Sequence, residues 1–274
     1  MSFLNGLLRS AADIVLIPFR DFAPIVGITV LSLVAAIFIL FVYKHTSNQK
    51  ALDNVKRKIH AGLFEIRLYN DDFRSIVGAL FDILRANLTY MRHSFRPMLW
   101  TLPPMFLLIA QFQFLYGYEG LRPDQPALLK VLFEPGAFSG DKPALEVTTP
   151  AGLRVDEPFV WIPSLGEATW RLHAEAPGDY ELTIGIGTET ATKSVRVADG
   201  VARRSPFRIK GFLNELLFPA EAPLPSGGAF AEITVTYAET NVNVFGFEMH
   251  LIIVFFVLSV VFAFALRGSF GVTF

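Results

Sequence analysis

The stretch FAPIVGITVLSLVAAIFILFVY, from Phe22 to Tyr43, decides the class of this protein because its 22 residues include no charge. A helix needs about 20 apolar residues to cross the hydrocarbon core of a bilayer. The stretch MHLIIVFFVLSVVFAFAL, from Met249 to Leu266, is almost as long and equally free of acidic and basic residues apart from His250. Both stretches are therefore predicted to span a membrane.

A third stretch, PMLWTLPPMFLLIAQFQFLY from Pro97 to Tyr116, is long enough to span but is interrupted by prolines and amides. With it, the sequence predicts three membrane-spanning helices at residues 22–43, 97–116 and 247–267. The composition agrees, since 52% of the residues are hydrophobic and 18% are charged, whereas soluble domains carry about 25% charged residues.

The distribution of Lys and Arg predicts the orientation of the chain. Residues 44–96 contain ten basic and five acidic side chains, a balance of +5, and residues 117–246 contain eleven basic and seventeen acidic ones, a balance of −6. Because basic loops stay in the cytoplasm, we expect the N-terminus outside and the C-terminus inside. The predicted location is the inner (cytoplasmic) membrane of a prokaryotic cell, with residues 268–274 as a short cytoplasmic tail.

Residues 1–21 place apolar side chains on one helical face, with Arg9 and Asp13 on the other. This pattern predicts an amphipathic helix lying on the outer leaflet. The alternative is an extension of the first span.

Residues 44–96 have apolar residues at helical spacings of three and four, with Asn70, Asp71 and Asp72 halfway along. These three side chains favour a helix start, so two helices should fold back as an antiparallel coiled-coil hairpin. One uninterrupted helix, the alternative, would not return Pro97 to the bilayer.

Residues 117–246 alternate short β-type runs with Gly and Pro breakers, a pattern typical of an antiparallel sheet. We expect an extracytoplasmic β-sandwich of immunoglobulin-like type. The fold class predicted for the whole chain is therefore a membrane protein of α+β class.

The sequence shows no arrangement of residues that is typical of a catalytic or metal site. The chain has no cysteine, which excludes disulfides and thiolate metal sites, and its five histidines are scattered. The three quoted apolar stretches contain no carboxylate for proteolysis or ion coupling. We expect no enzymatic activity, no metal site and no cofactor, and the net charge of −1 gives no support to nucleic-acid binding.

Polar side chains inside the spans are the remaining candidates. Either they form hydrogen bonds between helices, worth about 0.6 kcal/mol each, or they line a groove for polar parts of another chain. The candidates for lining such a groove are Thr29, Ser32, Thr101, Gln111 and Gln113.

The stretch NLTYMRHSFRPMLWTLPPMFLLIAQFQFLYGY, from Asn87 to Tyr118, carries a resemblance to a known family. A basic helix there runs straight into a proline-containing span. Together with the order span, basic hairpin, span, span, this resembles the YidC-like membrane-protein insertases. The likeness is to the archaeal branch and to the third subunit of the ER membrane complex, and it covers about half of the chain.

The resemblance implies a bundle with a hydrophilic groove open to the cytoplasm, which passes client segments into the bilayer. It also implies that the basic hairpin receives nascent clients or a ribosome, in contact with lipid. The contact candidates are Lys50, Lys56, Arg57, Lys58, Arg92 and Arg96.

This chain departs from the family in two respects. Bacterial relatives place an arginine in the groove from the first core span, whereas the nearest arginine here is Arg20. Relatives also have a short connection where this chain has its β domain. The alternative function is that of a membrane-anchored adaptor, without insertase activity, whose β domain binds an envelope partner.

Overall fold

The computed structural model describes residues 22–272 apart from 70, 124, 139–141, 199, 212–213, 215–216 and 245, together with Gly6, Ser10 and Ile14. The predicted outer-leaflet helix at residues 1–21 and the end of the predicted tail therefore lie outside the described residues. The chain forms two compact units. The helical unit comprises Thr29–Phe106 and Phe255–Phe274, and the β unit comprises Leu107–Val254 with the chain up to Ile28.

Three helices are long and apolar enough to cross a membrane: α2 (Pro24–Thr46), α4 (Phe73–Tyr116) and α6 (Leu251–Phe270). The remaining described structure includes antiparallel sheets. The α+β class and the three helices of membrane-spanning length are thus confirmed.

The second arm of the hairpin and the second span are one helix of 44 residues, so no break in the helix marks the membrane boundary predicted at residue 96. Pro97, Pro103 and Pro104 lie inside it. Membrane helices tolerate such prolines because neighbouring groups satisfy the freed carbonyls.

The helix of the third span begins four residues later than the predicted start at residue 247. Residues 247–250 form strand β11 (Phe247–His250), which pairs with β10 (Asn241–Val244). Gly246 turns the chain between the two strands with a φ of 90°, and its N–H donates to Asn243 Oδ1 at 2.9 Å. The helix therefore begins at Leu251.

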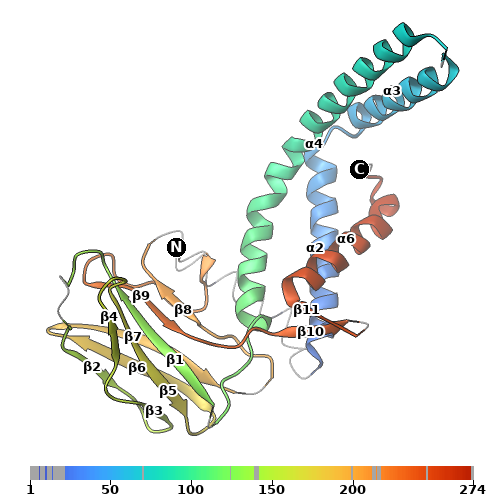
Figure 1. Cartoon of the computed structure of the whole chain (residues 1–274). Helices are drawn as coiled ribbons and strands as arrows, with labels where there is room; N and C mark the ends of the chain where they lie inside the picture. The colour runs from blue at the N-terminus through green and yellow to red at the C-terminus, as the bar shows by residue number, and fades with distance from the viewer. Residues whose placement is uncertain are drawn as a thin grey trace. The chain divides into compact units, whose positions relative to one another are not determined.

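Helix α3 (Gln49–Leu68) and the first part of α4 run side by side as an antiparallel hairpin (Figure 1). Asp72 caps the returning helix, since its carboxylate accepts from Arg74 N at 3.1 Å and from Ser75 Oγ at 2.6 Å. These bonds lower the pKa of the Asp72 carboxyl. Between the arms, Gly62 lies so close to Ile83 that an added Cβ would meet Ile83 Cγ1 at 2.6 Å.

Small residues join α2 to α6 in the helical unit. Ser32 is fully buried, and its hydroxyl donates to the carbonyl of Phe255 at 3.2 Å. Ala35 and Ala36 are fully buried as well. Small side chains let membrane helices approach closely, so this contact fits helix packing of the kind found in a bilayer.

The β unit contains two larger antiparallel sheets (Figure 1). One has the order β3-β5-β1-β9-β8, with β4 also paired to β5, and the other has the order β2-β6-β7. The strands are β1 (Pro126–Phe133), β2 (Leu145–Thr148), β3 (Leu153–Val155), β4 (Val160–Ile162), β5 (Glu167–Ala174), β6 (Gly178–Ile186), β7 (Glu189–Val197), β8 (Phe207–Ile209) and β9 (Phe230–Val235).

Alternate residues of the long strands face one core, as the period of two of a strand requires. Leu129 and Val131 of β1, Trp170 of β5 and Ile184 of β6 are at most 1% exposed and belong to a single cluster. Because this cluster draws on both sheets, they pack face to face.

Candidate functional site

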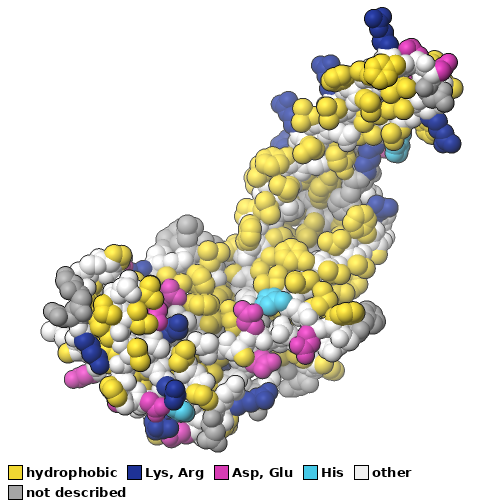
Figure 2. Space-filling model, in the orientation of Figure 1, with side chains coloured by type: hydrophobic (Ala, Val, Ile, Leu, Met, Phe, Trp, Pro, Cys, Tyr) yellow, Lys and Arg dark blue, Asp and Glu magenta, His cyan; other side chains and the backbone are white. Residues whose placement is uncertain are grey.

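A stripe of large apolar side chains on α4 is exposed along the hairpin. Leu80, Leu84, Leu88, Met91 and Phe95 are between 53% and 68% exposed. Their spacings of four, four, three and four residues place them on one face of a helix with 3.6 residues per turn. We call these five residues the α4 stripe. Figure 2 shows hydrophobic side chains over the hairpin, with Lys and Arg between them.

The α4 stripe continues without a break into the predicted span, through Met98 and Leu102, which are 45% and 38% exposed. Within a bilayer such exposure is ordinary, because lipid covers the side chain. The stripe itself precedes the apolar segment that begins at Pro97, so in the predicted topology it faces water. A contiguous apolar surface in water marks an interaction site.

A basic cleft lies at the base of the hairpin. Its volume is about 1090 Å³, and it is lined by the end of α2, the start of α3, the middle of α4 and Gly271. The lining side chains include four permanent cations, two histidines and one tryptophan: Lys44, His45, Lys50, Arg92, His93, Arg96 and Trp100. We call this cavity the basic cleft.

Three of the basic residues singled out in the sequence, Lys50, Arg92 and Arg96, meet in the basic cleft. The run at residues 56–58 lies further along α3 and lines none of the cavities described. Lys56 Nζ lies 5.8 Å from the centre of the Tyr90 ring on α4, and Arg57 pairs with Asp53 at 2.9 Å. Lys58 is exposed.

The five groove candidates belong to different units. Thr29, Ser32 and Thr101 lie in the helical unit, and Gln111 and Gln113 lie in the β unit. Ser32 bonds to α6, as described above, and the Thr101 hydroxyl donates to the Met98 carbonyl of its own helix at 2.9 Å. A groove formed by all five stays a prediction.

Gln111 has a partner that sequence reasoning missed. It is 6% exposed, and its Oε1 accepts a hydrogen bond of 2.9 Å from Arg203 Nη1 in the loop after β7. The next residue, Arg204, donates its backbone N–H to the Phe114 carbonyl at 2.8 Å. The amide of Gln111 is thus accounted for by a bond between α4 and the β unit. Gln113 packs its side chain against Gly117.

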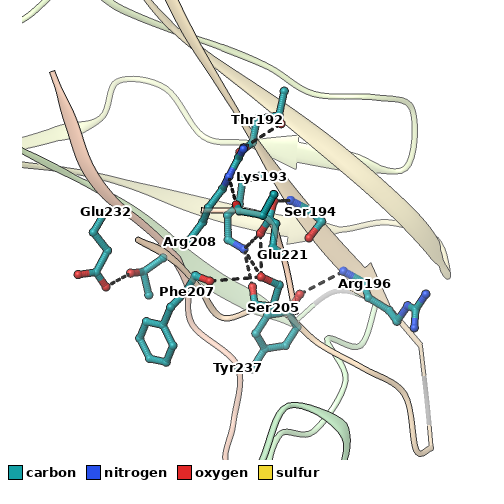
Figure 3. A network of polar contacts seen from close by, with 12 residues as sticks. Thr192, Lys193, Ser194, Arg196, Ser205, Phe207, Arg208, Glu221, Glu232 and Tyr237 are labelled. Carbon is teal, nitrogen blue, oxygen red and sulfur yellow. Dashed lines mark hydrogen bonds and ion pairs between the residues drawn. The ribbon is translucent and has the colours of Figure 1, made fainter. Parts of the chain in front are cut away.

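The β unit also contains a buried polar network that sequence analysis did not identify (Figure 3). The fully buried Lys193 Nζ donates to the Ser205 carbonyl at 2.6 Å, to Ser205 Oγ at 2.9 Å and to Glu221 Oε2 at 2.6 Å. Burial lowers the pKa of Lys193 to about 8, and Glu221 opposes that shift.

A serine next to a buried lysine can serve as a nucleophile and its base only if the lysine is neutral with a free lone pair. Here all three N–H groups of the ammonium are engaged, and the Glu221 carboxylate favours the charged form. This arrangement fits a structural tie rather than a catalytic pair.

The same network closes the free edge of β7. Ser194 N donates to Glu221 Oε1 at 2.9 Å, and Arg196 N donates to Tyr237 Oη at 3.1 Å. Burial raises the pKa of Tyr237 to about 12, so its hydroxyl stays neutral. An edge strand whose outward N–H groups are bonded offers no template to an incoming strand.

No family model matches the sequence, and no curated protein matches it. A crystal structure of domains 4 and 5 of the S-layer protein SbsC matches 30% of this chain and 47% of that chain, at 20% identity and a TM-score of 0.22. The chain thus covers about half of the matched structure, and a similarity of this size carries no argument about fold or function.

Proposed function

We propose that this protein is a YidC-like insertion factor, which receives an apolar segment of a client membrane protein on the α4 stripe and passes it into the bilayer. The continuity of the stripe supports this proposal. An apolar track that begins on the water-exposed hairpin and continues on the same face of a membrane-spanning helix suits a segment that moves between these two environments.

Two further features of the hairpin support a client as the occupant of the α4 stripe. Met91 belongs to the stripe, and flexible methionine side chains adapt to many partner shapes. Three exposed arginines lie along the same part of α4 as the stripe: Arg85, Arg92 and Arg96. Their charge suits a client segment with acidic flanks. The predicted orientation, with the hairpin in the cytoplasm, would present the stripe to newly made chains, with a ribosome as the alternative partner.

The proposal is tested by replacing Leu84 and Leu88 with serine in the full chain. Burial of one leucine side chain is worth roughly 1.5–3 kcal/mol, so loss of both should slow insertion of a single-span client into proteoliposomes by at least about tenfold. The matched control is Leu63→Ser with Leu68→Ser, which removes two exposed leucines from α3. It should insert the client at the parental rate.

Equal insertion rates for the stripe variant and the parent would contradict the proposal. Equal losses in the stripe variant and the α3 control would also contradict it, because apolar surface anywhere on the hairpin would then suffice.

The adaptor function remains the second candidate because of how α4 meets the β unit. Bonds from Arg203 and Arg204 hold its last turns, which suits a β unit that is anchored through α4 and binds an envelope partner. In that case a constant partner subunit would cover the α4 stripe. Two results together would favour this function. The protein would co-purify with one partner in stoichiometric amount, and cells with the Leu84→Ser, Leu88→Ser variant would insert membrane proteins normally.

A further inference from the structure

The basic cleft lies at the ends of two apolar segments, one in α2 and one in α4. Lys44 and His45 occupy the last turn of α2, directly after its apolar run, and Arg92 and Arg96 directly precede the apolar run of α4. By their sequence positions, the cations of the cleft sit next to a membrane surface.

The charge of the basic cleft is of one sign. Four of its lining residues are Lys or Arg, two are His, and the set contains no Asp or Glu. Lys44, Lys50, Arg92 and Arg96 are exposed. Within the residues that the structure describes, none of these four cations has a carboxylate within 4.0 Å. Four like charges gathered without a counter-ion destabilise the chain unless an anion joins them.

Three carbonyls near the end of α2 accept hydrogen bonds from the residues that follow them. Thr46 Oγ1 donates to the Val42 carbonyl at 2.7 Å, and Ser47 N donates to the Tyr43 carbonyl at 2.9 Å. His45 Nδ1 lies 2.8 Å from the Phe41 carbonyl. Because a carbonyl only accepts, the proton of that bond is on Nδ1, and Nε2 donates to an anion only when the imidazole carries a second proton.

Trp100 indicates which kind of anion suits the cleft. Arg92, Arg96 and Trp100 follow one another at intervals of four residues, so one face of α4 carries two guanidinium groups and then an indole. Trp100 is 63% exposed, and tryptophan at the end of an apolar segment is typical of the headgroup level of a bilayer.

We infer that the basic cleft binds the phosphate group of an anionic phospholipid, with Arg92 and Arg96 on the phosphate and Trp100 at the start of the acyl chains. Arginine forms paired hydrogen bonds with phosphate oxygens. The cleft, at about 1090 Å³, is slightly larger than typical small-molecule sites of about 300–1,000 Å³, which leaves room for a headgroup. The cleft shares no residue with the α4 stripe, so lipid binding can be measured without a client, although Arg92 and Arg96 are also among the arginines that flank the stripe.

The test uses the purified full chain in mild detergent with phosphatidylglycerol or phosphatidylcholine, and measures the lipid retained after gel filtration. The parent should retain phosphatidylglycerol in preference. Each juxtamembrane cation contributes about 1 kcal/mol, which is about a fivefold change in affinity. The double variant Arg92→Gln, Arg96→Gln should therefore bind phosphatidylglycerol roughly 30-fold more weakly. The control Arg67→Gln, Arg74→Gln removes the same charge from exposed positions outside the cleft and should bind like the parent.

A second titration, with inorganic phosphate and no lipid, distinguishes the source of the phosphate. Saturable phosphate binding that the cleft variant loses, without any preference between the two lipids, would overturn the lipid and assign the cleft to a free phosphate compound. Equal losses in the cleft variant and the control would overturn the site, because net charge alone would explain them. Binding of an acidic client peptide at the cleft in place of phosphatidylglycerol would overturn it as well.

Discussion

Lys193 and Glu221 show how one buried ion pair organises the β unit. The lysine extends from an edge strand and holds two loop residues that lie 12 and 28 positions further along the chain. A buried ion pair adds little to stability compared with well-packed apolar residues, but removal of one partner leaves an uncompensated charge. The network therefore makes the fold sensitive to single substitutions at these positions.

Glu221→Ala should destabilise the β unit by about 3–5 kcal/mol, because it leaves the Lys193 ammonium buried without its carboxylate. Thermal unfolding of the full chain, followed by near-ultraviolet circular dichroism, measures the change. The control is Arg154→Gln, which breaks a pair whose side chains are 57% and 36% exposed and should cost at most about 1 kcal/mol. Similar losses in both variants would show that the buried network has no special role.

Gln111 shows why the site could be predicted only in part from single residues. Two amides in a span indicate a polar contact, but the choice between a groove and a bonded neighbour depends on what lies opposite. That neighbour, Arg203, is 92 positions away, in a loop that no periodicity places. The arginine pair at residues 203–204 is visible in the sequence, but it cannot be assigned to Gln111 without knowing the fold of the β unit.

At the scale of elements, the helices could be predicted well because length and charge alone decide a membrane span. The turn between the two arms of the hairpin was also predictable, since the carboxylate of Asp72 caps the second helix. The start of α6 was not. The four residues from Phe247 to His250 directly precede the apolar run, and only their pairing with β10 shows that they form a strand and not the first turn of the helix.

The basic cleft follows from the hairpin itself. Two helices that leave the bilayer and return to it must bring their two bases together, so Lys50 should meet Arg92 and Arg96. The sequence did not single out His45, His93 or Trp100 as members, because their roles depend on which face of each helix turns inward.

Gly62 tests how the two arms of the hairpin pack. An alanine there gains up to about 1 kcal/mol of helix propensity, but its Cβ would lie 2.6 Å from Ile83 Cγ1. We expect Gly62→Ala to lower the melting temperature of the helices relative to Gly78→Ala, where nothing lies within 4 Å. Circular dichroism at 222 nm measures both.

Ile83→Ala in the Gly62→Ala background should restore part of the loss, because it removes the atom that the new Cβ meets. A melting temperature for Gly62→Ala equal to or above that of Gly78→Ala would mean that the arms are not in contact at this point.

At the scale of the whole molecule, the charge balance predicts that the hairpin and the β unit lie on opposite sides of the membrane. The chain has no cysteine, so single cysteines can be labelled without background. In intact cells, an impermeant thiol reagent should modify Ser226→Cys and leave Asp71→Cys unmodified until the membrane is opened. Both positions are exposed. The reverse pattern would place the hairpin outside, where it could not meet newly made chains.

The proposed function depends on contact between the α4 stripe and a client, and site-specific photocrosslinking tests that contact most directly. A photoreactive amino acid replaces Leu88, in the centre of the stripe, or Asp82, an exposed residue on another face of α4. Stalled ribosomes then present a membrane protein whose first apolar segment has just emerged. We predict crosslinks to that segment from position 88, much weaker ones from position 82, and loss of both when the segment is made polar. Crosslinks from position 88 to one constant partner, with none to nascent chains, would contradict the account and identify the protein as an adaptor.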